Sequence, residues 1–283
     1  MDTPDLILDR IDDLPTLPDV VAEVNRLVND SNASAGDLNS ILSRDVALSA
    51  KILKLVNSSF YGFPRRITSI SQAVVILGFN TIRNLSLSAF VFDSLKGRSS
   101  LFDTPALWAH SIGVAVAAQT VGQRIGISQV EDLFMAGILH DIGKVVMCQY
   151  MPEYTEKIMQ TVAERNCTFL DAERQFCEWT HAELGGALLE RWNLPVTIVA
   201  CVMGHHGAAG EESMQRGSAI IHLADVVTRT LAIGKSGDNL VPIMIPSVPA
   251  KLELSAEDIG KVMDTTLDEI RQADAFFELA GGM

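Results

Sequence analysis

The chain has 283 residues, of which 48% are hydrophobic, and its formal net charge is −13. This hydrophobic content is enough for a packed core and excludes a disordered chain. The negative charge argues against general binding to nucleic acid or to an anionic membrane, because both need a basic surface. An anionic substrate would need local positive charge from a metal ion or a lysine.

Membrane insertion and secretion are not expected. We find no uninterrupted apolar run close to the roughly 18 residues that span a bilayer. The first residues, MDTPDLILDRIDD, are acidic where a secretory signal is basic and then apolar. We therefore predict a cytoplasmic protein that does not bind membranes.

The four cysteines lie in predicted helices and form no CxxC pair, so we interpret them as buried free thiols, with zinc ligation as the alternative. They are Cys148, Cys167, Cys177 and Cys201.

Apolar residues at spacings of three, four and seven predict short helices through the N-terminal third of the chain. Gly78 interrupts the last of these patterns. The predicted helices cover residues 15–29, 37–42, 46–56, 69–77 and 81–95.

Between two of these helices, residues 58–63 form a predicted loop with three aromatic side chains, followed by Arg65 and Arg66. The aromatic rings are expected to plug the junction between the N-terminal group of helices and the second group. The alternative is that Tyr61 and the two arginines border the metal site or a partner site.

The small polar stretch 97–100 is the best candidate for a boundary between two parts of the chain. We therefore divide the chain into an N-terminal helical part, residues 1–98, and a second helical part, residues 99–283.

The second part is also predicted to be helical. Ser128 with Glu131, and Thr180 with Glu183, have the spacing of capping boxes, and Ser255 precedes the final predicted helix. The predicted helices cover residues 103–126, the segment after 128, 153–165, 170–177, 181–192, 196–203, 218–231 and the segment from 255. No stretch alternates with period two, so the predicted fold class is all-α, a two-part helical bundle.

The stretch GILHDIGK, residues 137–144, places His140 next to Asp141 at the end of an apolar helix. Adjacent helical positions point about 100° apart, so both side chains can face one metal only if the helix loosens there. We expect Ile142 and Gly143 to allow that turn. Lys144 would add a positive charge beside a bound phosphate. The alternative is an ordinary helix end with a polar residue bonded to a carbonyl.

All six histidines lie between residues 110 and 222. Five of them, together with two aspartates, form a predicted ligand set on separate helices, suited to one or two divalent ions of iron, manganese or zinc and not to calcium. An aspartate on an apolar helix needs a partner or a metal. For His110 alone, a hydrogen-bonded core histidine and a metal ligand are equally good interpretations. The set is His110, His140, Asp141, His181, His205, His206 and Asp225. His222 is expected to support this site from behind or to lie at the surface.

At these residues the chain resembles the HD superfamily of metal-dependent phosphohydrolases, whose pattern is a histidine, then His-Asp, then a distant aspartate. His110, His140, Asp141 and Asp225 match it one by one. Further histidines match the HD-GYP branch, which holds two metals, but here HHGAAGEES has Gly207 in the glutamate position and lacks GYP. This departure argues against cyclic di-guanylate hydrolysis.

The N-terminal half resembles the HD-related output domain family, HDOD. The resemblance rests on SRDVALSAKILKLVNSSFYGFPRRITSISQAVVILG, on AGILHDIGK and on LLERWNLP with the HH after it. It covers about residues 14–230 and implies one HDOD unit of a bacterial signalling protein.

Two functions are compatible with these patterns. The first is a metal-dependent phosphohydrolase that acts on a nucleotide or another phosphate ester, with Asp141 and Lys144 as the catalytic residues. The second is a non-catalytic output module that binds signalling proteins and whose metal, if any, is structural.

Overall fold

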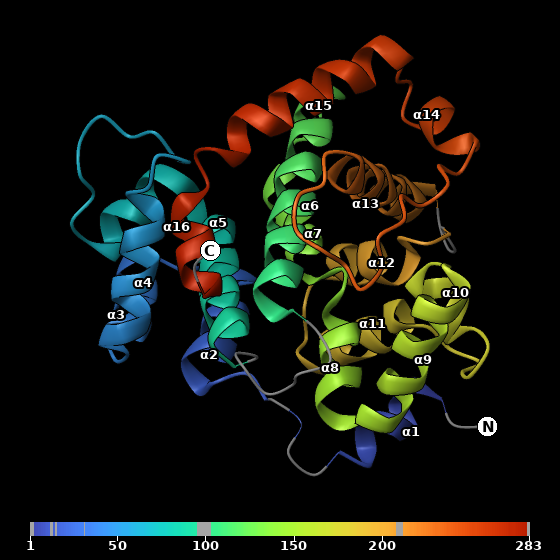
Figure 1. Ribbon diagram of the computed structural model, residues 1–283. Helices are drawn as coiled ribbons and strands as arrows, with labels where there is room; N and C mark the ends of the chain where they lie inside the picture. The colour runs from blue at the N-terminus through green and yellow to red at the C-terminus, as the bar shows by residue number, and fades with distance from the viewer. Residues whose placement is uncertain are drawn as a thin grey trace. The chain divides into compact units, whose positions relative to one another are not determined.

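The computed structural model describes residues 3–11, 14, 16–30, 32–94, 103–207 and 212–281, and every regular element in these ranges is a helix (Figure 1). The predicted all-α fold class is confirmed. The helices are α1 Pro4–Asp9, α2 Asp19–Val28, α3 Ala35–Leu42, α4 Val46–Val56, α5 Ile70–Ser94, α6 Thr104–Arg124, α7 Val130–Leu139, α8 Ile142–Tyr150, α9 Pro152–Arg165, α10 Phe169–Glu173, α11 His181–Arg191, α12 Val196–Gly204, α13 Glu212–Thr230, α14 Ser247–Lys251, α15 Ala256–Ile270 and α16 Asp274–Ala280.

The chain forms two compact units, each built from two stretches of sequence. The larger unit contains Met1–Leu14 and Gly97–Asp268, and the smaller unit contains Pro15–Lys96 and Glu269–Met283. The predicted single division near residue 98 therefore misplaces the two ends of the chain. The N-terminal segment belongs to the larger unit, and the C-terminal segment belongs to the smaller unit. The proposed boundary at residues 97–100 lies outside the described residues.

In the smaller unit, α5 packs against α2, α3, α4 and α16. Its helical geometry breaks at Gly78, where φ is 82° and ψ is 167°. L-residues rarely adopt this conformation, so glycine allows the two halves of α5 to follow the packing of their own neighbours. The predicted break between residues 77 and 81 is thus present.

Within the described residues, one helix stretch, Ile70–Asp93, is long and apolar enough to cross a membrane by length and composition, with a mean hydropathy of 1.5. It is not an uninterrupted apolar run, because it contains polar residues such as Arg83 and Asn84. In addition, 61% of this window is buried inside the protein, and Gly78 interrupts it. We interpret α5 as a core helix, and the cytoplasmic location stays a prediction.

The helix beginning near Ser255 is not the final one, because α16 follows it. Ser255 caps α15 as expected, since its hydroxyl accepts a hydrogen bond from the Asp258 N–H at 3.1 Å. The short α16 buries Ala275, Phe276 and Leu279. Seven residues give too short a pattern to stand out in the sequence.

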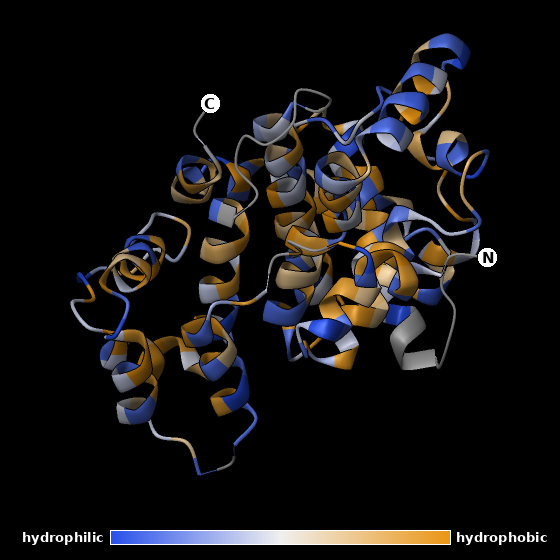
Figure 2. Ribbon diagram, turned by 90° about the horizontal axis from the view of Figure 1, so that it is seen from below, coloured by the Kyte–Doolittle hydropathy of each residue, from blue (hydrophilic) through white to orange (hydrophobic). Residues whose placement is uncertain are grey.

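In the larger unit, α6 packs against α7 and α13, while α12 contacts α7, α11 and α13. Orange and blue residues alternate around the helices in Figure 2, as expected for amphipathic helices with one buried face. The exception is α6, whose residues are mostly buried from Leu107 to Gly122. This arrangement places α6 in the interior of the unit.

Two predicted helix starts have different outcomes. Thr180 and Glu183 form the predicted capping box at α11. Ser128 and Glu131 do not, because α7 begins only at Val130 and Gln129 is its N-cap residue without a side-chain bond. The chain leaves α6 through Gly126 at φ 74°, and Ser128 still belongs to this turn. Two further helix boundaries differ from the prediction. The helix α13 begins before residue 218, and α10 ends at residue 173 instead of 177.

The aromatic loop of the smaller unit contributes to packing. The ring of Phe60 lies edge-on to the ring of Phe276 on α16, with centroids 5.4 Å apart. Tyr61 and Phe63 have parallel rings 6.3 Å apart. Arg65 and Arg66 are exposed. A packing role for Phe60 is therefore observed within the smaller unit. A plug at the junction between the two groups and a binding role for the arginines stay predictions.

We predict that Gly78→Ala lowers the free energy of unfolding by about 1–3 kcal/mol, because alanine is strained at this φ and ψ. Urea unfolding followed by circular dichroism measures the change. The matched control is Gly260→Ala in the interior of α15, where an added Cβ meets nothing within 4 Å. This control should be neutral or stabilising by up to about 1 kcal/mol. Equal destabilisation by both substitutions would contradict the role given to Gly78.

Candidate metal centre

The predicted ligand residues come from five helices of the larger unit and meet in its interior. Within this set, three overlapping groups have ligand atoms that all lie within 4.8 Å of one another. The residues are His110 on α6, His140 and Asp141 in the turn between α7 and α8, His181 at the start of α11, His205 and His206 after α12, and Asp225 on α13. We call this set the candidate metal centre.

Asp141 lies between two groups of histidines. Its Oδ2 atom is 3.4 Å from Nε2 of His140 and 3.9 Å from Nε2 of His110. Its Oδ1 atom is 3.2 Å from Nε2 of His181 and 3.9 Å from Nε2 of His205. The two oxygens of one carboxylate therefore face different imidazoles, as a bridge between two ions requires.

The first group is completed by Asp225. Its Oδ1 atom lies 3.2 Å from Nε2 of His110. Asp225 and His110 belong to the packed helices α13 and α6 and are both buried. This contact places the distant aspartate of the sequence pattern beside its first histidine.

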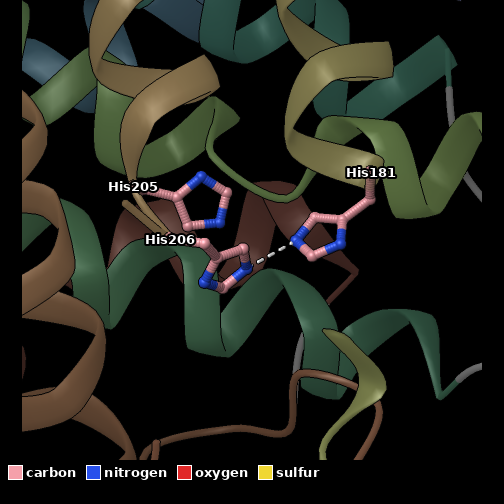
Figure 3. A group of neighbouring side chains, drawn as sticks. All are labelled: His181, His205 and His206. Carbon is pink, nitrogen blue, oxygen red and sulfur yellow. Dashed lines mark hydrogen bonds between the residues drawn. The ribbon is translucent and has the colours of Figure 1, made fainter. Parts of the chain in front are cut away.

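The second group contains three imidazoles (Figure 3). Figure 3 shows that His205 and His206, which follow α12, lie beside His181 at the start of α11. The Nε2 atoms of His206 and His181 are 3.0 Å apart. Two nitrogens at this separation can share one ion, since metal–nitrogen bonds are about 2.0–2.1 Å long.

Three of the histidines are oriented by the same device. The Nδ1–H of His140 donates to the Gly137 carbonyl at 2.8 Å, and that of His205 donates to the Val202 carbonyl at 2.6 Å. The Nδ1 of His181 lies 2.8 Å from Oε1 of Glu173. Because carbonyl and carboxylate oxygens accept hydrogen bonds, each ring carries its proton on Nδ1 and turns the Nε2 lone pair toward Asp141.

Several atoms of the centre are buried without a hydrogen-bond partner among the described residues. They are Nε2 of His110 and His205 and Oδ1 of Asp141 and Asp225. An unpartnered buried polar atom destabilises a protein by about 1–3 kcal/mol. A divalent metal would satisfy these atoms, so the donor set fits such an ion.

The pKa values of two histidines are shifted so that their rings are neutral. Burial lowers the pKa of His205 well below its usual value, and the charges of His140 and His181 lower it further. Burial also lowers the pKa of His206 well below its usual value, with His205 adding to the shift. A neutral imidazole is the form that binds a metal.

The two carboxylates are ionised. Burial alone would raise the pKa of Asp141, but the charges of His140 and Lys144 outweigh it and hold this pKa well below its usual value. Burial opposes ionisation of Asp225 as well, but the neighbouring imidazole of His110 lowers its pKa. An ionised carboxylate is likewise the form that binds a metal.

Close contact between helix backbones brings the donors together. An added Cβ on Gly143 would lie 1.9 Å from the His181 carbonyl oxygen, and one on Gly137 would lie 2.5 Å from Cα of Ala115. The predicted role of Gly143 in a turn is wrong. It belongs to α8, whereas the chain turns at His140 and Asp141. Glycine is needed there because α8 and α11 touch.

Lys144 is buried, and its amine already has two acceptors. The Nζ atom donates to Oδ2 of Asp141 at 2.8 Å and to the Ser236 carbonyl at 2.9 Å. The ring of Phe169 lies 5.1 Å from the same atom. Lys144 is thus the counter-ion of Asp141, and Ser236 belongs to the loop between α13 and α14.

Glu173 was not identified from the sequence. It is fully buried and accepts from both the ring Nδ1 and the backbone N–H of His181. Burial lowers the pKa of His181, but the charge of Glu173 reverses the shift and raises it. A sequence signal does exist, because Glu173 lies four positions after Phe169 and shares its apolar helix face.

Two further predictions have partial outcomes. His222 is buried and contacts the backbone of His205 in the candidate metal centre. Its Nδ1–H donates to the His205 carbonyl at 3.0 Å, and its Nε2 accepts from the Ile245 N–H. All four cysteines are free thiols, but only Cys148 and Cys201 are buried.

We predict that Glu173→Gln weakens metal binding by about 10- to 100-fold, as is usual when the partner of a ligating histidine is changed. Glutamine has one acceptor oxygen, so either the ring or the backbone N–H of His181 loses its partner. Titration calorimetry with Mn²⁺ measures the affinity. Exposed Glu178→Gln is the control, and an equal effect in both variants would argue against the positioning role.

Sequence comparison finds a longer relative. An uncharacterised protein of Treponema pallidum (strain Nichols) is 32% identical over 201 residues, which is 71% of this chain and 39% of that protein. The matched segment therefore spans less than half the length of this relative.

Two solved structures have the same fold. An HDOD domain protein of unknown function from Geobacter sulfurreducens is 28% identical, with a TM-score of 0.80 and coverage of 98% of this chain and 96% of that chain. A candidate phosphohydrolase from Shewanella amazonensis SB2B is 22% identical, with a TM-score of 0.77 and coverage of 97% and 98%. At this identity, the second similarity concerns the fold alone.

The family model of the HDOD domain matches residues 14–208, which include the His-Asp pair and the paired histidines. The predicted resemblance is confirmed. The chain belongs to the HDOD domain family.

Proposed function

We propose that the protein is a metal-dependent phosphohydrolase of bacterial signal transduction that acts on a nucleotide or another phosphate ester. The observation that carries the proposal is the position of Asp141, whose two oxygens face imidazole nitrogens on opposite sides. Nitrogen and oxygen donors of this number suit iron, manganese or zinc at one or two centres.

In this proposal, His110, His140 and Asp225 would hold one ion, His181, His205 and His206 would hold a second, and Asp141 would contribute its carboxylate to the site. Such ions lower the pKa of bound water and neutralise phosphate oxygens. The protein side chains fix the donors, because hydrogen bonds at Nδ1 orient the rings. Lys144 balances the charge of Asp141 and has one N–H left for a phosphate oxygen.

The residues after the paired histidines narrow the choice of substrate. Gly207 stands where the HD-GYP branch has a glutamate, and the GYP segment is missing. We therefore do not propose cyclic di-guanylate as the substrate. The net charge of −13 also makes general binding to nucleic acid unfavourable, because such binding depends on positive charge that neutralises phosphates.

A second candidate function is favoured by the burial of the centre. Lys144 is 2% exposed and the ligand residues other than His206 are at most 3% exposed. A closed site of this kind also suits a structural metal in a non-catalytic output module that binds signalling proteins. The two candidates share the metal and differ in turnover.

We predict that protein purified without chelator contains a divalent metal and that Asp141→Ala loses it, because both ligand groups depend on this carboxylate. Elemental analysis measures the content. The helices of the smaller unit should stay folded, as seen by circular dichroism. Asp264→Ala, which removes an exposed carboxylate on α15, should keep the metal. Unchanged metal content in Asp141→Ala would show that the ligand assignment is wrong.

Turnover separates the two candidate functions. With Mn²⁺ bound, hydrolysis of bis(p-nitrophenyl) phosphate should occur in the unmodified protein and in Asp264→Ala, and should be lost in Asp141→Ala. Bound metal without hydrolysis of this substrate or of nucleotide esters would favour the output module. Absence of metal from the purified protein would contradict the hydrolase proposal, because the proposed hydrolysis requires a bound metal.

A further inference from the structure

A cavity of about 590 Å³ lies between α7, α12, α13 and α14 of the larger unit. Its volume is in the range of small-molecule sites, roughly 300–1,000 Å³. None of the described residues that line it belongs to the candidate metal centre. It is therefore a separate site from the one where we propose phosphate ester hydrolysis.

Part of the cavity wall is apolar. Ile127, Leu133 and Ile220 contribute aliphatic side chains, and Cys201 contributes its thiol. Burial raises the pKa of this thiol to about 12, with the charge of Asp132 adding to the shift, so the group is neutral. These walls match an apolar ligand body.

Arg216 introduces a fixed positive charge into the same cavity. Its Nε atom is buried and has no hydrogen-bond partner among the described residues. A guanidinium stays protonated in proteins, so this N–H needs an acceptor. Carboxylate and phosphate oxygens are the acceptors whose geometry fits a guanidinium best.

The other charged side chains of the cavity limit how many negative charges a ligand can carry. Lys251 adds a second positive charge, whereas Asp132 and Glu253 bring two negative charges to the lining. The cavity therefore favours one anionic group near Arg216 and disfavours a polyanion such as a nucleoside triphosphate, because like charges repel.

We propose that this cavity binds a small molecule with an apolar body and a single anionic head group, either a carboxylate or a phosphate. Two aromatic dyes test the two halves of the proposal. Anilinonaphthalene sulfonate has an apolar body and one anion, and N-phenyl-1-naphthylamine has the same body without the anion. Both should bind the full chain saturably with increased fluorescence.

A filling substitution tests whether the dyes occupy this cavity. Thr197 is an exposed residue in the first turn of α12 that lines the cavity, so Thr197→Trp should place a ring in it and reduce binding of both dyes at least about tenfold. Val196→Trp is the matched control, because Val196 is 62% exposed and does not line the cavity. Urea unfolding should confirm that both variants are folded.

A charge substitution tests the anionic head. Arg216→Gln should weaken anilinonaphthalene sulfonate about tenfold, since hydrogen bonds to a charged group are lost, and should leave N-phenyl-1-naphthylamine unchanged. Exposed Arg174→Gln is the control. This pair keeps the proposal testable if Thr197→Trp does not fold.

Competition distinguishes the two sources of the anion. Displacement of the dye by octanoate identifies a carboxylate ligand, and displacement by octyl phosphate identifies a phosphate ligand. The proposal is overturned if the unmodified protein binds neither dye saturably, or if Thr197→Trp or Arg216→Gln binds both dyes as the controls do. Because no metal is needed, failure of the hydrolase proposal leaves this test intact.

Discussion

The burial of Asp141 is the constraint on which the centre depends. A carboxylate inside a protein destabilises the fold by several kcal/mol unless charged or polar partners surround it. Here Lys144 supplies an ion pair, and imidazoles face both oxygens. Removing the carboxylate would leave the buried ammonium of Lys144 without its counter-ion. The same residue therefore organises the metal ligands and stabilises the interior.

Convergence of the donors further requires helices that approach more closely than side chains normally permit. An imidazole reaches only a short distance from its backbone, so donors on several helices can meet only if those helices nearly touch. Gly137 and Gly143 provide this contact, because an added Cβ at either position would collide with the backbone of α6 or of α11. The glycines of GILHDIGK thus act through packing, as much as its histidine and aspartate act through chemistry.

The residues that converge in the centre could be found from the sequence because polar side chains are rare on apolar helices, so His110 and Asp225 stood out. Features that depend on tertiary contacts were harder to predict. Glu173 looked like an ordinary residue of an amphipathic helix until its partner, His181, was located in space. The sequence of the loop around Ser236 contained no pattern that predicted its contact with Lys144. The failed capping box at Ser128 shows that spacing predicts a cap only where the helix actually begins.

The loop between α13 and α14 bears on the choice between catalysis and a structural metal. Among the described residues, six hydrogen bonds join it to the surrounding helices. Three are Lys144 to the Ser236 carbonyl, the Lys235 N–H to the Ala106 carbonyl, and the Ile245 N–H to His222. The Phe169 N–H also donates to Asp238, and Arg229 donates to Asp238 and to the Leu240 carbonyl. Each such bond contributes about 0.5–1.5 kcal/mol net, so opening the whole loop costs about 3–9 kcal/mol. The loop therefore favours a closed centre, which suits a structural metal, whereas catalysis requires that the loop open for a substrate to enter.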